Sequence, residues 1–380
     1  MAAGITSEQL LSPNHIIKAD YAHHSHIYGR GVTVAVLDSG IQPRADFLSL
    51  PDASAPSRIL HFEDFVHARS LPYDDAGHGT HICGKIASSH PIGSEYLGIA
   101  PACNLVVLKV LDQYGNAPLS TFIRALRWIH HYQSAYHIRI VNISIGTTLS
   151  SGYSHSDLLI QEVEQLWTDG LIVCTSAGNN GPAPGSISAP GSSCRVITVG
   201  ASDDNIPALR SNIHRQYSGR GPTGCSTVKP ELVAPGSQIV SCSNQRLGYT
   251  AKTGTSMSTS LVSGAIALLL EQEPSLSNRD VKNRLHDCAR RLNLSLFSDK
   301  TFFIPNKITV ITNTLNTHIT NTTNAFPKLK SSHTAVDIPI DIARIILPML
   351  PNISSIQPRT SAILHTVFLF INYLHSLKIY

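Results

Sequence analysis

The sequence predicts an α/β fold, with a mostly parallel central sheet and helices on both of its faces. Two observations carry this prediction. Continuous runs of apolar and β-branched residues, typical of strands buried on both faces, recur between residues 31 and 199. Segments with apolar residues at helical spacing stand between several of these runs. Strands that alternate with helices in this way form a parallel sheet joined by right-handed crossovers.

The expected strands are residues 31–37, 105–111, 138–144, 171–177 and 196–199. The first of them ends at Asp38, which a glycine turn follows. A small helix is expected in residues 16–28, and amphipathic helices in residues 119–136 and 158–167. A more apolar helix begins near Ser256 and includes residues 261–270. The last expected helix covers residues 277–292, with Ser277 as its N-cap.

The composition indicates a globular protein. Of 380 residues, 42% are hydrophobic and 14% are charged, which excludes a disordered chain and allows one large or two smaller domains. The net charge of +4 is spread along the sequence without a run of Lys or Arg. We therefore expect no binding to nucleic acid.

Two features of the sequence favour the cytoplasm. The first residues, Met1 to Glu8, lack the basic and apolar regions of a secretory signal, although another route of secretion stays open. The seven cysteines are scattered and show no CxxC or Cys/His metal spacing. An apolar stretch at residues 362–380 is too polar to predict a transmembrane helix. Contact of this tail with a membrane is the less favoured alternative to packing on the domain.

Three residues in different parts of the chain are candidates for catalysis. Asp38 ends the first strand, His78 stands between two glycines, and Ser256 lies in the first turn of the apolar helix. Each has an ordinary structural explanation, since Asp is common in turns and Ser is a common N-cap. Together they are the set needed for nucleophilic acyl transfer, in the chain order Asp, His, Ser. His81 follows His78 by three residues, but no third ligand at a suitable spacing completes a metal site.

The sequence motifs around these residues resemble those of the subtilisin-like serine proteases (subtilases, peptidase S8), and most closely those of the bacterial intracellular AprX-type branch. The resemblance covers roughly residues 15–295 and implies a peptidase domain at 30–295, with a leader or short helix at 1–29 and an extension of unknown structure at 296–380. The matching motifs are Val34–Gly40, His78–His81, Ser176–Gly181, Gly219–Pro222, Lys229–Gly236 and Gly254–Met257.

The resemblance implies a subtilisin-like three-layer sandwich and a serine endopeptidase that acts on polypeptides. Asp38 is then the orienting carboxylate, His78 the general base and acid, and Ser256 the nucleophile. Asn179 matches the oxyanion-hole asparagine, which acts with the backbone N–H of Ser256. The alternative is a catalytically silent subtilase fold that serves as a binding or regulatory protein. The start of the helix after the nucleophile, Met257–Ser260, departs from the usual Met-Ala-Thr-Pro.

The resemblance also implies where substrate binds. An extended peptide would pair with exposed strand edges, and Asp112 is the only charged residue in the matching segments. We therefore expect a preference for apolar or aromatic side chains before the cleaved bond, with Ser188 as a candidate for the pocket floor. The matching residues are Ser144, Ile145 and Gly146, then Leu111, Tyr114 and Gly115, and Ser176, Ala177 and Gly178.

No cofactor is expected to be required, and calcium is a possible ligand. Asp46 matches a calcium-ligand position elsewhere in the family, but a single oxygen ligand does not make a site. Residues 88–96 occupy the place of a calcium loop in secreted relatives, yet Glu95 is their only carboxylate.

Overall fold

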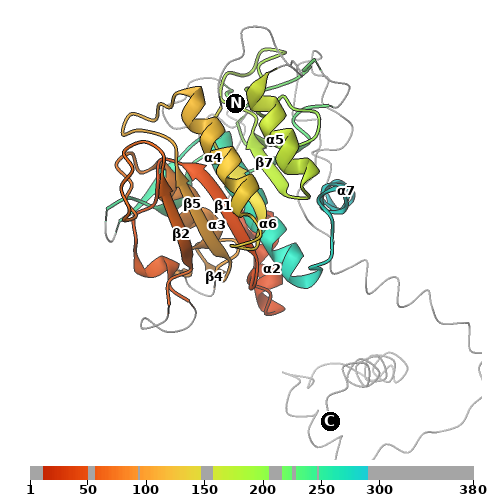
Figure 1. The fold of residues 1–380 in the computed structure, drawn as a ribbon. Helices are drawn as coiled ribbons and strands as arrows, with labels where there is room; N and C mark the ends of the chain where they lie inside the picture. Colours follow the sequence, from red (N-terminus) through yellow and green to blue (C-terminus); the bar gives the residue numbers. More distant parts are fainter. Residues whose placement is uncertain are drawn as a thin grey trace, which may run out of the picture. The chain divides into compact units, whose positions relative to one another are not determined.

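The computed structural model describes residues 12–49, 56–92, 95–146, 157–204, 216–224, 228–245 and 248–289. All of these lie in the first of the two units into which the chain divides, residues 1–320. A seven-stranded sheet with helices on both faces forms their centre (Figure 1), which confirms the predicted α/β class. The predicted extension at residues 296–380 lies outside the described residues.

The strands of the central sheet are all parallel and stand in the order β2-β5-β1-β6-β7-β8-β9. The five predicted strands are β1, β5, β6, β7 and β8, and two further strands lie at the edges. The bounds are β1 Thr33–Asp38, β2 Ile59–Asp64, β5 Asn104–Lys109, β6 Ile138–Ile143, β7 Ile172–Ser176, β8 Ile197–Ala201 and β9 Leu232–Ala234. Two antiparallel pairs stand apart from this sheet: β3 Pro91–Ile92 with β4 Glu95–Tyr96, and β10 Ile239–Cys242 with β11 Tyr249–Lys252.

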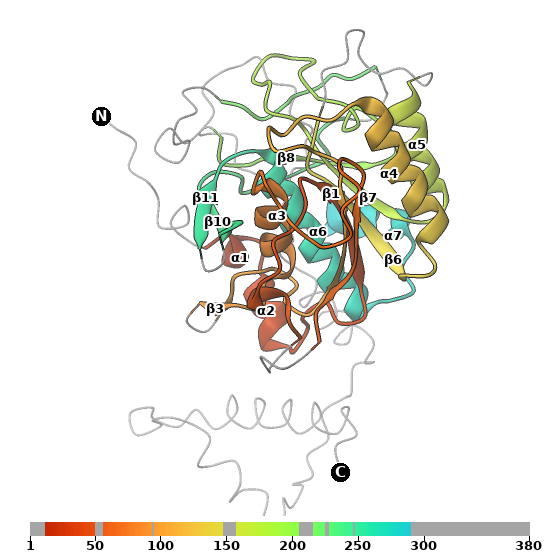
Figure 2. The same cartoon turned by 60° about the vertical axis from the view of Figure 1, so that its left-hand side comes forward.

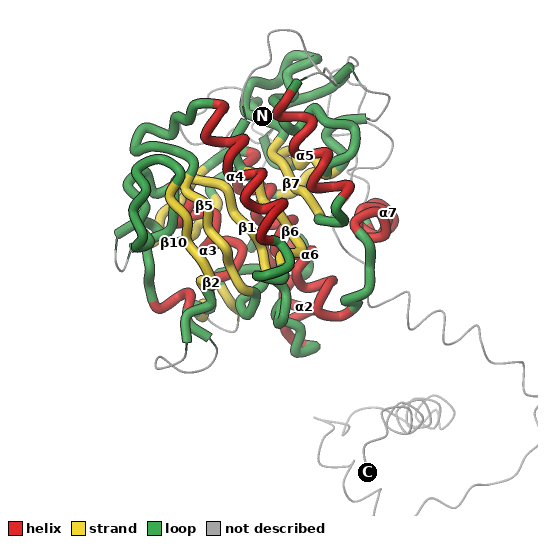
Figure 3. The backbone as a smooth tube through the Cα atoms, in the orientation of Figure 1, coloured by secondary structure: helices red, strands yellow, loops and turns green. Residues whose placement is uncertain are grey.

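Helices cover the two faces of the sheet (Figures 2 and 3). One face carries α3 (His78–Ala87) and α6 (Thr255–Gln272), and the other carries α4 (Leu119–Tyr132) and α5 (Leu158–Thr168). The β1 side chains alternate accordingly. Val34 and Val36 pack in the core on the α3 and α6 side, whereas Ala35 and Leu37 pack on the α4 and α5 side. This alternation explains why β1 reads as an uninterrupted apolar run.

The predicted N-terminal helix differs from the prediction, whereas the last described helix begins where it was expected. The expected helix at residues 16–28 is two short helices, α1 (Pro13–Ile16) and α2 (Ala19–His24), because Lys18 between them is left-handed with φ 59°. Helix α7 (Asn278–Cys288) begins at the predicted cap, and Ser277 and Asp280 form a capping box. Among the described residues, no helix is both long enough and apolar enough to cross a membrane.

Candidate active site

Asp38 and His78 form the first contact of the site. Asp38 is the last residue of β1 and is fully buried. Its two carboxylate oxygens lie 2.8 and 3.0 Å from Nδ1 of His78. Because a carboxylate only accepts hydrogen bonds, Nδ1 is the nitrogen that carries the proton. The contact therefore leaves the lone pair of Nε2 available as a base.

The electrostatics of His78 follow from this pairing. Burial alone would lower its pKa, but the charge of Asp38 and the hydrogen bond to it raise the pKa above its ordinary value of 6.5. His81 shows the opposite case, because burial lowers its pKa to about 3. Nε2 of His81 lies 2.9 Å from the carbonyl oxygen of Ile239, so the two histidines have different partners.

Asp74 positions the turn that leads into His78, and the sequence analysis did not single it out. This buried carboxylate accepts hydrogen bonds from the backbone N–H groups of Gly77 (2.7 Å) and Thr80 (2.8 Å) and from the hydroxyl of Ser39 (2.8 Å). The signal in the sequence is an acidic residue just ahead of a helix start, where backbone N–H groups lack helical partners. Asp74 thus fixes the first turn of α3.

Ser256 is the second residue of α6 and is 7% exposed. Its hydroxyl donates to the carbonyl oxygen of Ser144 (2.8 Å), and the Ser144 hydroxyl donates back to the Ser256 carbonyl (3.2 Å). Ser144 directly follows β6, just as Asp38 ends β1. Because Leu37 pairs with Ile143, Asp38 and Ser144 each follow directly after a paired position of the neighbouring strands β1 and β6. The ends of β1 and β6 therefore bring Ser256 toward His78.

The resting position of the Ser256 hydroxyl differs in one respect from the expected triad. Within the described part of the chain, this hydroxyl bonds to Ser144 and makes no hydrogen bond to His78. Rotation of the serine side chain about one single bond redirects its oxygen. Catalytic hydrogen bonds are often long in enzymes without substrate and tighten when substrate binds.

Asn179 lies beside the start of α6. Its Oδ1 accepts hydrogen bonds from the backbone N–H of Thr255 (3.0 Å) and from the Thr255 hydroxyl (3.1 Å). A backbone N–H can only donate, so the amide oxygen must face Thr255 and Nδ2 is the outward donor. A Cβ on Gly254 would lie 3.1 Å from that Nδ2, so the glycine leaves room for the amide. The first N–H groups of α6, that of Ser256 included, lie at the same end of the helix.

Two of the predicted substrate-binding segments meet at Ser188. A Cβ added to Gly146 would lie 2.7 Å from Cβ of Ser188, and one added to Gly178 would clash with the Ser188 hydroxyl oxygen. Residues 144–146 and 176–178 therefore flank this buried serine. The backbone N–H of Gly178 also donates to the Thr255 hydroxyl (3.1 Å), which joins the second segment to the start of α6.

The third segment, Leu111 to Gly115, starts beside the site and leads away from it. The backbone N–H of Leu111 donates to the carbonyl oxygen of Asp38 (3.2 Å), while its side chain is buried in the core under α4 and α5. Tyr114 is 78% exposed, and Gly115 closes the turn with φ +79°. The backbone N–H of Leu111 is thus already engaged within the protein, and pairing of this segment with a peptide stays a prediction. Fully buried Lys109 holds this turn, because its Nζ donates to the carbonyl oxygen of Leu111 (2.9 Å).

Asp46 does not fit the calcium-ligand role that the sequence analysis considered. Its Oδ2 accepts from Nε of Arg44 (2.7 Å), and these side chains are only 6% and 2% exposed. Its Oδ1 accepts from Ser88 (2.8 Å), Tyr249 (3.1 Å) and the thiol of Cys242 (3.2 Å). The guanidinium already neutralises the charge that a cation would balance. The calcium hypothesis for Asp46 is therefore replaced by a buried ion pair.

Comparison with known proteins identifies a family for this chain. The model of the subtilase family (Peptidase S8) matches residues 29–323. The serine protease AprX of Bacillus subtilis (strain 168) is 39% identical over 276 residues, which cover 68% of this chain and 61% of that protein. Subtilisin Savinase of Lederbergia lenta is 33% identical over 277 residues, which cover 73% of this chain and 90% of that protein. The chain therefore spans about three fifths of the length of AprX.

Solved structures give the same result for the fold. A cold-adapted subtilisin-like serine proteinase superposes with a TM-score of 0.59 at 26% identity, covering 75% of this chain and 90% of that one. Sphericase superposes with a TM-score of 0.55 at 27% identity, covering 70% and 88%.

Proposed function

Since the chain belongs to the subtilase family of serine peptidases, we propose that it is an endopeptidase that cleaves polypeptides through an acyl-enzyme on Ser256. One observation carries the proposal. The imidazole of His78, whose Nδ1 bonds to Asp38 at the end of β1, and the hydroxyl of Ser256, bonded beyond the end of β6, are anchored at neighbouring strand ends.

The proposed reaction begins when the Ser256 hydroxyl turns from Ser144 toward Nε2 of His78. Its oxygen attacks the peptide carbonyl carbon while His78 takes its proton, and Asp38 stabilises the resulting imidazolium. His78 then gives that proton to the leaving amine, and the C–N bond breaks. Water attacks the acyl-enzyme in the same manner, with His78 again as base, and releases the carboxylic acid and free Ser256.

Asn179 is proposed to stabilise the charge that develops on the former carbonyl oxygen. Its outward Nδ2 and the backbone N–H of Ser256 stand at the N-terminus of α6, where the helix dipole also favours negative charge. These donors are held in place before the reaction, because Thr255 fixes the amide. Little reorganisation is then needed when charge develops.

We propose that the residue before the cleaved bond is apolar or aromatic. The segments around Ser188, residues 144–146 and 176–178, contain no charged residue. A panel of peptides that differ only at this position tests the proposal. Faster cleavage after Phe or Leu than after Arg or Lys is expected, and the reverse order would refute it.

We propose a reducing compartment, the cytoplasm, for this chain. The buried cysteines Cys83, Cys103, Cys174 and Cys242 are thiols and not disulfides. Burial raises the pKa of Cys103 and Cys174 to about 12, so these two thiols stay protonated. Fractionation of the source cells tests the assignment, and recovery of the protein outside the cytoplasm would contradict it.

Hydrolysis of a peptide substrate by the full chain tests the proposed activity. The wild-type protein is expected to show turnover, and Ser256→Ala to lose almost all of it while keeping its melting temperature. A folded wild-type protein without turnover on any peptide would instead favour the catalytically silent binding protein. The resting bond between Ser256 and Ser144 is the observation that keeps this second function in consideration.

A further inference from the structure

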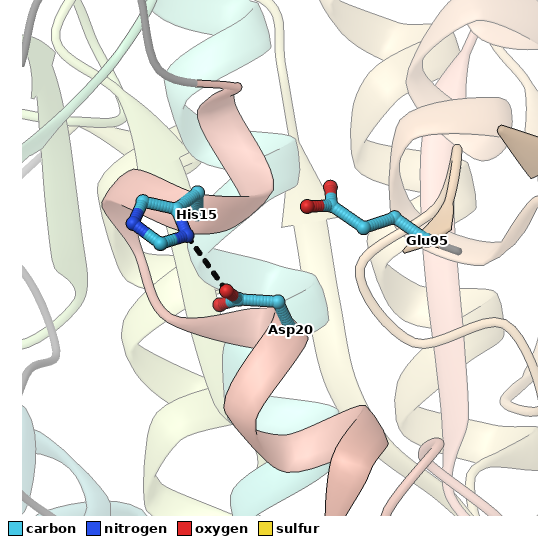
Figure 4. Close-up of side chains that lie close together, drawn as sticks. All are labelled: His15, Asp20 and Glu95. Atoms are coloured by element: carbon cyan, nitrogen blue, oxygen red, sulfur yellow. Dashed lines mark hydrogen bonds and ion pairs between the residues drawn. The ribbon is translucent and has the colours of Figure 1, made fainter. Parts of the chain in front are cut away.

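Three potential metal ligands come together at the N-terminal helices, apart from the residues of the proposed reaction (Figure 4). They are His15 on α1, Asp20 on α2 and Glu95 on β4. Each offers one atom, and these three atoms all lie within 4.8 Å of one another. Nδ1 of His15 is 2.7 Å from a carboxylate oxygen of Asp20, and in Figure 4 the Glu95 carboxylate points toward that pair.

Two buried atoms beside this cluster lack hydrogen-bond partners among the residues that the structure describes. They are Oδ1 of Asp20 and Nδ1 of His23, whose residues are each 8% exposed. Nε2 of His23 donates to the carbonyl oxygen of Ile99 (2.9 Å), so its unpaired Nδ1 carries a lone pair. Asp20, His23 and Glu95 line one cavity of about 230 Å³. Unpaired acceptor atoms and carboxylates that line one cavity are suited to a cation.

We propose that His15, Asp20 and Glu95 bind a divalent transition-metal ion, with zinc the best match. Zinc takes imidazole nitrogen and carboxylate oxygen ligands, whereas calcium and magnesium take oxygen ligands. Zinc bonds of roughly 2.0–2.2 Å place tetrahedral ligand atoms about 3.4 Å apart. The widest of the three separations, at most 4.8 Å, therefore closes by up to about 1.4 Å around the ion, and the 2.7 Å separation of His15 from Asp20 opens by about 0.7 Å. Water completes the coordination.

Metal binding replaces a proton. Because a carboxylate cannot donate, Nδ1–H of His15 donates to Asp20 in the metal-free protein. When zinc binds Nδ1 of the neutral ring, the proton moves by way of water from Nδ1 to Nε2, so the ring stays neutral. The half-exposed side chain of His15 allows this exchange with water. Zinc affinity is expected to fall as the pH is lowered.

Ser12 forms hydrogen bonds with two of the residues in the cluster. Its hydroxyl donates to Oε2 of Glu95 (3.1 Å) and accepts from the backbone N–H of His15 (3.2 Å), so it orients two of the three ligands. Asn14 also ties α1 to β4 by donating to the carbonyl oxygen of Tyr96 (2.6 Å). A bound ion would add a coordination link between the N-terminal helices and the β3–β4 hairpin. We expect its main effect on stability, because none of its ligands takes part in the proposed reaction.

Zinc binding by the full chain with Ser256→Ala, which prevents self-digestion, tests the proposal. After treatment with a chelator, calorimetric titration is expected to show one equivalent of zinc. Zinc at 100-fold above its Kd is expected to raise the melting temperature by about 5 °C. Loss of an outer hydrogen bond to a ligand weakens metal binding roughly 10–100-fold. Ser12→Ala is expected to weaken zinc binding within that range, and Glu95→Gln, which alters a ligand itself, to weaken it by more. Absence of saturable zinc binding would overturn the proposal.

Two controls make the result specific. Glu63→Gln removes a carboxylate from the comparable His61–Glu63 pair on β2 (3.1 Å) and is expected to leave zinc binding unchanged. Cobalt in place of zinc is expected to give a spectrum without a thiolate-to-metal band, because no cysteine is a ligand. Equal loss in Glu63→Gln and Glu95→Gln, or a thiolate band, would contradict the assignment. Glu95 is partly exposed, so its variant is expected to fold even where Asp20→Asn does not.

Discussion

Replacement of Asp74 by asparagine is predicted to reduce both stability and turnover, although this residue does not touch the substrate. Its Oδ2 accepts from the backbone N–H and the hydroxyl of Thr80 (2.8 and 2.6 Å), and its Oδ1 accepts from Gly77 and Ser39. An amide NH₂ at either position faces a backbone N–H that can only donate. The better orientation places Nδ2 toward Thr80, whose hydroxyl can reverse and accept.

The magnitude follows from the bonds that are lost. One charge-assisted hydrogen bond disappears, one buried N–H loses its partner, and the remaining bonds become neutral ones. We expect a loss of about 2–4 kcal/mol in the free energy of unfolding. Because His78 is the first residue of α3, displacement of this turn is expected to lower kcat by about 10–100-fold, with KM changed less than about twofold.

The pH dependence of stability gives a second signature of Asp74. Burial alone would raise its pKa, but the hydrogen bonds from Thr80, Gly77 and Ser39 lower the pKa below its ordinary value of 3.8. This contribution to stability is therefore complete above about pH 4 and is lost as the pH falls through the lowered pKa. Asp74→Asn is expected to remove this acid-dependent part.

Urea denaturation and steady-state kinetics of Asp74→Asn are the assays. Asp157→Ala is the matched control, since Asp157 caps α5 on the opposite face of the sheet by accepting from the backbone N–H of Leu159 (2.8 Å). It is expected to lose about 1 kcal/mol with kcat unchanged. Wild-type kcat in a folded Asp74→Asn protein would refute the positioning role.

Three further predictions follow from the site and its surroundings. Asp38→Asn is expected to lower kcat/KM by about 10⁴-fold. Because Asp38 raises the pKa of His78, the low-pH limb of the kcat/KM profile should move to lower pH in the variant, and an unmoved limb would contradict this pairing. Asn179→Ala is expected to lower kcat by about 10²–10³-fold in steady-state assays, the loss known for one oxyanion donor in subtilisin, and an unchanged kcat would exclude the role. Arg44→Met leaves Asp46 buried without its cation and is expected to cost about 3–5 kcal/mol in urea denaturation, part of which Asp46→Asn in the same chain restores.

Strands that are buried on both faces of the sheet could be predicted from the sequence. Strand β1 was predictable because its side chains enter two cores, one on each face of the sheet. Strand β2 was missed because it lies at the edge of the sheet and is only half-buried, so its residues lack a continuous apolar run. Strand β9 was missed because only its three residues pair. The break at Lys18 depends on one left-handed residue, which the helical pattern does not reveal.

For the candidate site, local sequence motifs indicated the residue types but not the contacts between the residues. The motifs around Asp38, His78 and Ser256 identified candidates, whereas the bond between Ser256 and Ser144 depends on how β6 packs beside α6. The cluster at His15, Asp20 and Glu95 has no local spacing to detect, because its last ligand lies 75 residues beyond Asp20 in the chain. Such contacts arise only from the tertiary fold.

Labelling with a fluorophosphonate, followed by peptide mapping, tests the proposed triad most directly. Such a reagent phosphonylates a serine hydroxyl that a neighbouring imidazole has activated, with loss of fluoride. We predict stoichiometric modification of Ser256 in the wild-type protein, with the labelling rate greatly reduced by His78→Ala. A correctly folded protein that takes up no label, or that is labelled at another residue, would contradict the account.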